Sequence, residues 1–429
     1  MRETSDSIRC FFQKKGFEML FKWIKVHKKS IIVYLIMVLT VVLLNIIAWN
    51  SRTFCDAYIK YVFPVWVNTY GRLTGLFPFS VGEILLVLGV CCVAVFVLLL
   101  VCYTGMTVLQ TVAADKPAGK DSSISGEEPV QQATGDASVK SSGFRKFCHG
   151  YFLWFAWLVV CVCLIMTLNC FILYHATTFS EQYYGESKEE YTLEELLVVR
   201  NLVVEKCNTL SAQMPRDAQG MIVYDGDMEK EAIEAMQKLG QTYDRLDGYY
   251  PRPKPLAASD FFSQQYITGY FFPFSMEANY NDMMHIMNYP ATMCHELAHL
   301  RGYIYEDEAN FISFLACVQS EDPLFQYAGY LSVLNYLDND FFDAVGGNLE
   351  AYLAQPSILP QVHEDNVFLT QEAWEQVEED AVLDTEVVDA VSDEFTDTVL
   401  VVNGVEDGIL SYNRVVELLL QYYEKEGFE

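Results

Sequence analysis

Apolar residues are concentrated in the first part of the chain and recur with helical or alternating periods in the rest. Three runs that are almost free of charge lie at about residues 30–49, 84–103 and 151–174. Each run has the length of about 20 residues that a helix needs to cross the hydrocarbon core of a bilayer. We therefore predict three transmembrane helices, which together form a membrane anchor over residues 30–174.

The charges that flank these runs predict their orientation. The residues before the first run are rich in lysine: Lys14, Lys15, Lys22, Lys25, Lys28 and Lys29. Because basic loops stay in the cytoplasm, residues 1–29 should form a cytoplasmic N-terminus, and residues 50–83 an outside loop. Residues 113–143 are polar and rich in Gly and Ser, which is typical of a disordered cytoplasmic linker. The third run then places everything after about His175 outside the cytoplasm.

The polar half begins with two periodic segments. Apolar residues at helical spacing predict helices over residues 179–213 and 228–246. Residues 249–255 contain three prolines, so this segment should be an extended strap. Residues 261–281 are aromatic and β-favouring, with Gly269 and a proline as breaks, which predicts a small antiparallel hairpin or edge strand. That strand could be ordinary packed structure, or its free edge could hold an extended peptide.

The remaining segments are helical in pattern. Residues 309–337 form a long apolar run with a break at Pro323, and residues 412–423 form a closing amphipathic helix. We assign residues 175–363 to one extracytoplasmic domain, and residues 364–429 to an acidic segment with the closing helix. The expected fold is mainly α: three transmembrane helices followed by an α+β, zincin-like domain with a small antiparallel sheet.

Charge and cysteine content narrow the possible partners. The net charge is −29 and is concentrated in the last 250 residues. A protein that binds nucleic acid needs a basic surface, so we expect no nucleic-acid partner. Half of the 12 cysteines lie in or beside the apolar runs. The C-terminal part keeps only Cys207, Cys294 and Cys317, which is no disulfide framework. Cys294 is interpreted as a packed thiol, although it adjoins a histidine.

The strongest chemical signal is an H-E-x-x-H motif formed by His295, Glu296 and His299. Positions i and i+4 share one face of a helix, so both imidazoles can reach one metal ion. Glu296 stands beside the first ligand, where it can act as general base on a zinc-bound water. Gly302 provides a stop for this helix. The motif predicts a Zn²⁺ site, although other divalent ions also accept nitrogen and oxygen ligands.

The third ligand must come from the acidic cluster of Glu306, Asp307 and Glu308. The segment from Glu306 to Asn310 is similar to the E-x-x-A-[DN] segment of gluzincin peptidases, in which the Glu is the third ligand. We therefore prefer Glu306 and give Glu308 a supporting role. The short spacing after the second histidine departs from most gluzincins and leaves Glu308 open as the alternative.

Three further side chains could stabilise charge in the transition state. Tyr303 and Tyr305 follow the motif closely, and His285 precedes it. The sequence does not choose among them, and a single histidine such as His285 is more often structural.

Several segments together resemble one family. They are YPRPKP at 250–255, GYFFPF at 269–274, HELAHLRG at 295–302 and EDEANF at 306–311. In combination they resemble the DUF3810 family of bacterial membrane proteins. The resemblance implies a zinc-dependent, gluzincin-like metallopeptidase anchored in the cell membrane, and it implies no particular substrate.

Three hypotheses about function follow. The first is a membrane-anchored zinc metallopeptidase that hydrolyses peptide bonds of a protein or peptide substrate outside the cytoplasm. The second is a hydrolase that uses the same metal chemistry on a non-peptide envelope substrate. The third is a non-enzymatic envelope sensor or scaffold in which the metal is structural.

Overall fold

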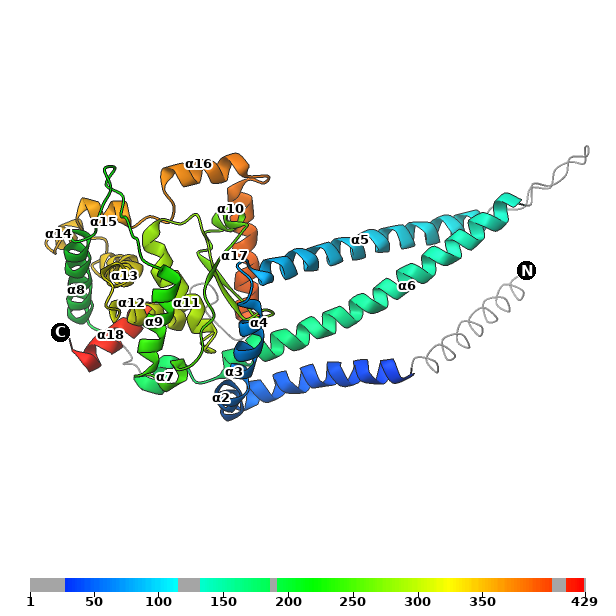
Figure 1. Cartoon of the computed structure of the whole chain (residues 1–429), viewed down its shortest axis with the longest axis horizontal. Helices are drawn as coiled ribbons and strands as arrows, with labels where there is room; N and C mark the ends of the chain where they lie inside the picture. Colours follow the sequence, from blue (N-terminus) through cyan, green and yellow to red (C-terminus); the bar gives the residue numbers. More distant parts are fainter. Residues whose placement is uncertain (1–27, 115–131, 186–190, 403–413, 428–429) are drawn as a thin grey trace, which may run out of the picture. The chain divides into compact units, whose positions relative to one another are not determined.

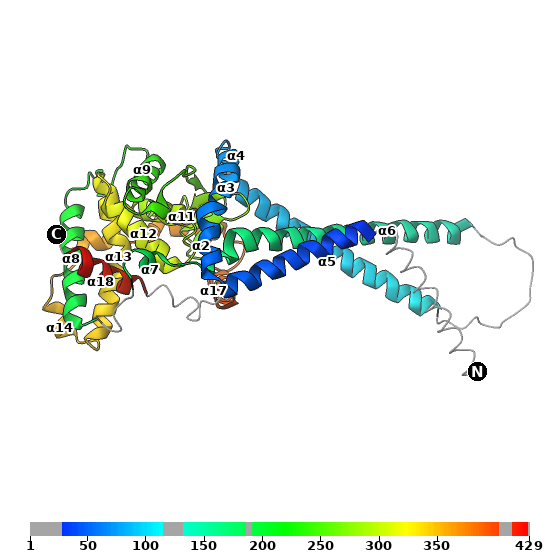
Figure 2. The ribbon, with the colours of Figure 1, turned by 90° about the horizontal axis from the view of Figure 1, so that it is seen from below.

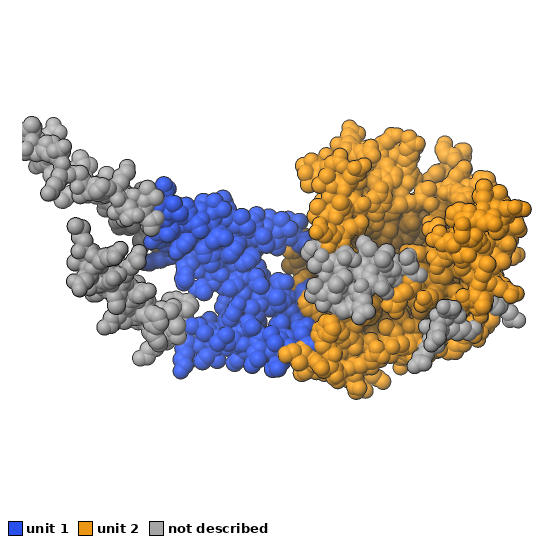
Figure 3. All heavy atoms as spheres, turned by 180° about the vertical axis from the view of Figure 1, so that it is seen from behind, with its two compact units in different colours: residues 1–45, 86–167 blue, residues 46–85, 168–429 orange. Residues whose placement is uncertain are grey.

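The computed structural model describes residues 28–114, 132–185, 191–402 and 414–427, and these residues are mainly helical (Figure 1). The chain forms two compact units (Figure 3). Unit 1 comprises residues 1–45 and 86–167, and unit 2 comprises residues 46–85 and 168–429. The connection between the first two apolar runs therefore belongs to the same unit as the C-terminal domain.

Among the described residues, three helices are long and apolar enough to cross a membrane, as the sequence predicts. The candidate spans are Lys28–Asn50, Val81–Leu109 and Gly143–His175. The second lies in α5 (Val81–Ala114) and the third begins in α6 (Gln132–Met166). α6 begins at Gln132, so the last part of the predicted linker is helical. No proline interrupts the chain there. Residues 1–27, with most of the predicted basic N-terminus, and residues 115–131 of the linker lie outside the described residues.

The connection between the first two spans is helical rather than a simple loop. It contains α2 (Arg52–Tyr61), α3 (Phe63–Trp66) and α4 (Arg72–Thr74), which Figure 2 shows from a second direction. Ser51 begins α2 by accepting a hydrogen bond from the Phe54 amide at 3.3 Å. Several large apolar side chains of this connection are exposed: Tyr61, Val62, Val65, Tyr70, Leu73, Leu76, Phe77 and Phe79.

A buried ion pair ties this connection to the rest of unit 2. The Glu277 carboxylate accepts hydrogen bonds from the amides of Val81 and Gly82 at 3.2 and 2.7 Å, at the start of α5. It also pairs with Lys254, whose ammonium group donates to the carbonyls of Thr74 and Phe79. Glu277 and Lys254 are both buried, and such charges are tolerated only when they are paired and hydrogen-bonded.

The helix predicted over 179–213 is two helices. The first is α7 (Phe179–Tyr183), which is followed by Gly185 with φ at +87°, a conformation that favours glycine. The second is α8 (Leu193–Ser211), which begins at a capping box between Thr192 and Glu195. The segment predicted over 228–246 forms α9 (Met228–Gly240) and a 3₁₀ turn.

The core of unit 2 is a group of packed helices. α8 packs along α13, and α18 contacts both (Figures 1 and 2). α11 packs between α9 and α12, with α13 also in contact. The bounds of the helices not yet given are Tyr289–His299 for α11, Glu306–Val318 for α12, Pro323–Ala344 for α13 and Val415–Glu426 for α18. The predicted break at Pro323 and the closing helix are confirmed.

A three-stranded sheet lies beside α11. Its strands are β1 (Lys254–Pro255), β2 (Gly269–Phe272) and β3 (Glu277–Tyr280), in the order β1-β3-β2. β2 and β3 form the predicted antiparallel hairpin, but β1 pairs with β3 in parallel. The prediction of a purely antiparallel sheet is therefore wrong, because the end of the proline-rich strap joins the sheet. The short helix α10 (Ser259–Ser263) follows β1.

The segment after α13 continues as short helices. They are α14 (Leu349–Leu353), α15 (Pro360–Asp365), α16 (Gln371–Asp380) and α17 (Thr385–Val402). The boundary expected between residues 363 and 364 falls inside α15. Asp365 at its end is buried and accepts hydrogen bonds from Arg216, Ser211 and Tyr327, so α15 is fastened to the domain that precedes it.

Replacing Asp365 with asparagine is expected to lower the free energy of unfolding by about 3 kcal/mol, because it leaves a largely buried Arg216 without its anion. Burial alone would raise the pKa of Asp365, but the hydrogen bonds from Arg216, Tyr327 and Ser211 hold it below the ordinary value of 3.8. This stabilisation is therefore present above pH 3.8 and is lost as the pH falls through the pKa of the folded state.

Thermal unfolding of the full chain in detergent, at neutral and at low pH, measures this effect. The matched control is Glu321→Gln, because Glu321 is 93% exposed and pairs with Lys238 at 3.5 Å. That change should alter the stability by less than about 0.5 kcal/mol. Equal stability of the two variants would contradict the role given to the Asp365 pair.

Candidate metal centre

The two histidines of the motif lie on one buried face of α11. This helix has Pro290 in its first turn and is followed by Gly302, whose φ is +84°. The rings of His295 and His299 lie with their centroids 4.6 Å apart and their Nε2 atoms 3.0 Å apart. The i, i+4 spacing therefore brings the two imidazoles together as predicted.

Each imidazole is oriented through its other nitrogen. His299 Nδ1 lies 2.7 Å from the Tyr303 carbonyl oxygen, and His295 Nδ1 lies 2.8 Å from Oδ1 of Asn310. Both oxygens are acceptors, so each Nδ1 carries the proton and donates it. The Nε2 atoms are then directed into the space that the two rings share, which is the arrangement that histidine ligands of metals adopt.

Glu306 completes this cluster from the first turn of α12. Its carboxylate oxygens lie 2.9 Å from His295 Nε2 and 3.7 Å from His299 Nε2. Glu308 is directed elsewhere, because it accepts hydrogen bonds from the hydroxyl and the amide of Ser180, the former at 2.6 Å. Asp307 is buried beside Arg414 at 3.3 Å. Of the three acidic candidates, only Glu306 meets the imidazoles.

Glu296 lies at the inner wall of the site. It is buried, and its Oε2 has no hydrogen-bond partner among the described residues. One ligand atom of Glu296 lies within 4.8 Å of those of both histidines. β2 approaches it so closely that a Cβ on Gly269 would lie 2.6 Å from Glu296 Oε1. Burial raises the pKa of Glu296 to about 8, so this carboxyl has the affinity for a proton that a general base needs.

The two histidines differ in their affinity for protons. Burial lowers the pKa of His299 to about 4, so this ring is neutral at pH 7. Burial acts in the same direction on His295, but the hydrogen bond and the charge of Glu306 raise its pKa to about 9. In the protein without metal, His295 and Glu306 therefore form an ion pair. A divalent cation would replace that proton, and the donor set of two nitrogens and one carboxylate fits zinc.

The three predicted stabilising side chains make contacts with other parts of unit 2. The Tyr305 hydroxyl donates to the Tyr174 carbonyl at 2.7 Å, and the Tyr303 ring lies 3.9 Å beneath the Arg245 guanidinium. His285 begins a 3₁₀ turn, where its Nδ1 accepts from the Met287 amide. A role of these three residues in stabilising charge stays a prediction.

Cys294 is a packed thiol, as expected. It is fully buried, and its sulfur lies 4.0 Å from the Ala232 carbonyl oxygen and 3.9 Å from the sulfur of Cys317. It takes no part in the cluster.

Three residues near the site had no role in the sequence analysis. Asn310 orients His295. Its position one helical turn after Glu306, on the same face of the helix, could have indicated that it lies near the site. Gly269 permits the approach of β2 to Glu296, and a glycine within a strand often marks such an approach. Tyr270 follows it; desolvation raises the pKa of its hydroxyl, and nearby acidic groups that include Glu296 and Glu306 raise it further.

Comparison with protein families identifies the chain. The model of a family described as proteins of unknown function, DUF3810, matches residues 133–420, about two thirds of the sequence. The chain belongs to the DUF3810 family. No curated protein and no solved structure gives a significant match. All four residues of the cluster lie inside the matched region, as does the third span, whereas the first two spans lie outside it. The family description assigns no activity.

Asn310→Ala is expected to weaken zinc binding by about 10- to 100-fold, because His295 then loses the acceptor that fixes its ring and tautomer. Competition with a chromophoric chelator measures the affinity. Asn208→Ala is the control, because Asn208 binds the backbone of Ser357 and Leu359 on another surface. Wild-type affinity in Asn310→Ala would mean that His295 is oriented by other contacts.

Proposed function

We propose that this DUF3810 protein is a membrane-anchored zinc metallopeptidase that hydrolyses peptide bonds outside the cytoplasm. The observation that carries the proposal is the convergence of His295 Nε2, His299 Nε2 and the Glu306 carboxylate, with both Nδ1 atoms held by acceptors. Two imidazole nitrogens and a carboxylate that meet at one point are the donor set that a zinc site needs. The lysine-rich N-terminus and the three candidate spans support a position outside the cytoplasm.

The chemistry follows from the proposed roles. His295, His299 and Glu306 would hold zinc, which supplies a Lewis acid that polarises a carbonyl group and activates water. Glu296 accepts the proton of the attacking water and then donates it to the nitrogen of the leaving amine. In the chain without metal, burial raises the pKa of Glu296 to about 8, so this carboxyl group can hold a proton between the two steps. The buried setting of the cluster strengthens every charge interaction in it.

Two features favour a peptide as the substrate. β2 is an edge strand of the sheet, and Gly269 at its start touches Glu296. An extended peptide that pairs with β2 would therefore pass beside the general base. The site also adjoins the membrane exit of the third span, because Tyr305, the residue before Glu306, binds the Tyr174 carbonyl. We infer that the substrate is a protein segment close to the membrane surface.

The proposal is tested with the full chain purified in detergent. We expect about one zinc ion per chain and cleavage of members of a quenched peptide library. A chelator should abolish cleavage, and added zinc should restore it.

The alternatives give different results in the same experiment. One tightly held zinc without cleavage of any peptide would favour the sensor or scaffold. Cleavage of an envelope glycan or lipid in place of peptides would favour the second hydrolase. A chain that binds no zinc would overturn the proposal.

A further inference from the structure

The segment of residues 51–80, which we call the α2–α4 connection, has two apolar faces. Phe63 and Val67 recur at helical spacing and are buried. Val62, Val65 and Leu73 also recur at helical spacing, but they are exposed. A helix at the surface of a domain needs one apolar stripe to pack against its core. The second apolar face therefore needs another partner.

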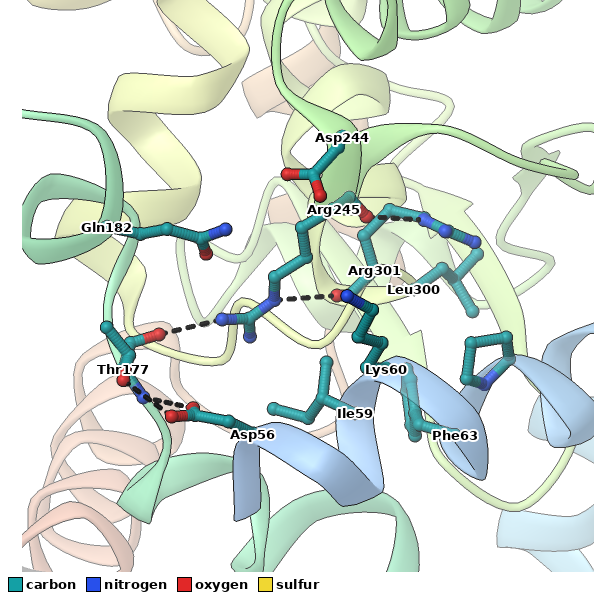
Figure 4. A pocket seen from close by; sticks show the side chains of 11 residues that line it. Asp56, Ile59, Lys60, Phe63, Thr177, Gln182, Asp244, Arg245, Leu300 and Arg301 are labelled. Carbon is teal, nitrogen blue, oxygen red and sulfur yellow. Dashed lines mark hydrogen bonds between the residues drawn. The ribbon is translucent and has the colours of Figure 1, made fainter. Parts of the chain in front are cut away.

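The buried face of the connection packs on the rest of unit 2. Figure 4 shows Asp56 and Ile59 of α2 beside Thr177, in the wall of a pocket that α2 shares with the C-terminal domain. Asp56 accepts hydrogen bonds from the amide and the hydroxyl of Thr177, both at 2.8 Å. In α4, the Thr74 hydroxyl donates to the Ser275 carbonyl at 3.0 Å. These contacts hold the connection in one orientation on unit 2.

The exposed face has the composition of a membrane interface. Tyr61 is 69% exposed and Leu76 is 76% exposed. Eight of the 30 residues in the connection are aromatic. Its three basic residues against one acidic residue give a net charge of +2, whereas the whole chain carries −29. Aromatic side chains, and basic side chains with long apolar stems, are the types that gather where a bilayer meets water.

Both ends of the connection continue directly into candidate spans. The first span ends at Asn50, and the second begins at Val81. The connection therefore leaves the bilayer and returns to it on the same side. The ring of Trp49 lies 4.5 Å from that of His175, the last residue of the third span, so the ends of the first and third spans are neighbours within unit 2.

The turn between β2 and β3 also reaches the ends of the spans. Asn169, which belongs to the third candidate span, donates to the Pro273 carbonyl at 2.7 Å. A Cβ on Gly82, at the start of the second span, would collide with the Phe272 ring. β2 therefore extends from the span ends at Phe272 to the metal centre at Gly269.

We propose that the exposed face of the α2–α4 connection lies in the interfacial layer of the membrane and holds unit 2 against the lipid surface. Val65, Leu73 and Leu76 contact the upper part of the acyl chains, and Lys60 extends to the headgroups. A lipid surface fits this face better than a second protein, because both ends of the connection enter the bilayer. The proposal does not depend on the metallopeptidase activity.

The test uses the full chain in liposomes of phosphatidylcholine, with a fluorescent amino acid in place of Leu73. Three nitroxide lipids carry the quencher on the headgroup, near the start of the acyl chain or at its end. Interfacial helices bury their apolar face about 5–10 Å into the boundary between headgroups and acyl chains, so the quencher near the start of the chain should reduce the fluorescence about threefold more than the other two. The same label in place of Tyr61 tests α2, and an unchanged melting temperature shows that each labelled chain is folded.

The matched control carries the label in place of Leu353, which is 68% exposed on α14. Figures 1 and 2 show α14 at the opposite end of unit 2 from α2, so none of the three lipids should quench this label. Equal quenching at Leu353 would overturn the assignment to the α2–α4 connection. Quenching of the Leu73 label by the headgroup nitroxide alone, or by none of the lipids, would place this face in water or against protein. Strongest quenching from the end of the acyl chain would place it in the bilayer core, and each of these results would overturn the proposal.

Discussion

Replacing Glu296 with glutamine should reduce the rate of peptide hydrolysis by about 10³-fold and leave zinc binding within about threefold of the wild type, because general acid–base catalysis contributes about 10²- to 10⁴-fold. Glutamine keeps the shape of the side chain against Gly269 but cannot accept a proton. Single-turnover cleavage of a library peptide and the zinc content of the same sample measure both quantities.

The Glu296→Gln chain should also fold as well as the wild type, because burial already favours the neutral form of Glu296. Glu205→Gln is the control, since Glu205 is exposed on α8 and should keep the full rate. If Glu296→Gln retained the wild-type rate, another group would have to transfer the proton. If it lost zinc, Glu296 would be a ligand instead of a base.

Replacing Glu306 with glutamine should weaken zinc binding by at least about 10²-fold, because it removes the anionic ligand that meets both imidazoles. Glu308→Gln should keep the wild-type affinity for zinc, because Glu308 faces Ser180 and lies outside the cluster. Zinc titration against a competing chelator, with both variants side by side, decides between the two glutamates.

The pair of variants is closely matched. Both glutamates lie in the first turn of α12, both are partly or fully buried, and the substitution is the same. A loss of zinc in both variants would indicate that α12 itself is disturbed. A loss in Glu308→Gln alone would exchange the roles of the two residues.

The parts of the fold that local patterns control could be predicted from the sequence. Long apolar runs have one physical solution in a bilayer, so the three spans were predictable. The H-E-x-x-H helix and the break at Pro323 follow from side-chain spacing and from the missing amide of proline. The parallel pairing of β1 with β3 was not predictable, because two residues at the end of a strap carry no signal of their partner.

The candidate site also contains one part that the sequence predicts and another that depends on how distant segments pack. The shared face of His295 and His299 is a property of one helix, so spacing alone predicts it. The choice between Glu306 and Glu308 depends on the angle at which α12 meets α11, and on Ser180, which lies more than a hundred residues away in sequence. Tyr303 and Tyr305 were candidates because of their nearness in sequence, and their side chains contact Arg245 and the Tyr174 carbonyl, neither of which the sequence predicts as a partner.

The Lys254–Glu277 pair has a consequence for how this protein could be released from its membrane. A chain cut after the third span would lose the amides of Val81 and Gly82 and the carbonyls of Thr74 and Phe79. These groups form the hydrogen bonds that replace water around this buried pair. Shedding by a cut at that point would therefore yield a destabilised fragment in place of a stable soluble domain. The segment between the first two spans is part of the folded unit 2, so this domain depends on its membrane anchor for stability.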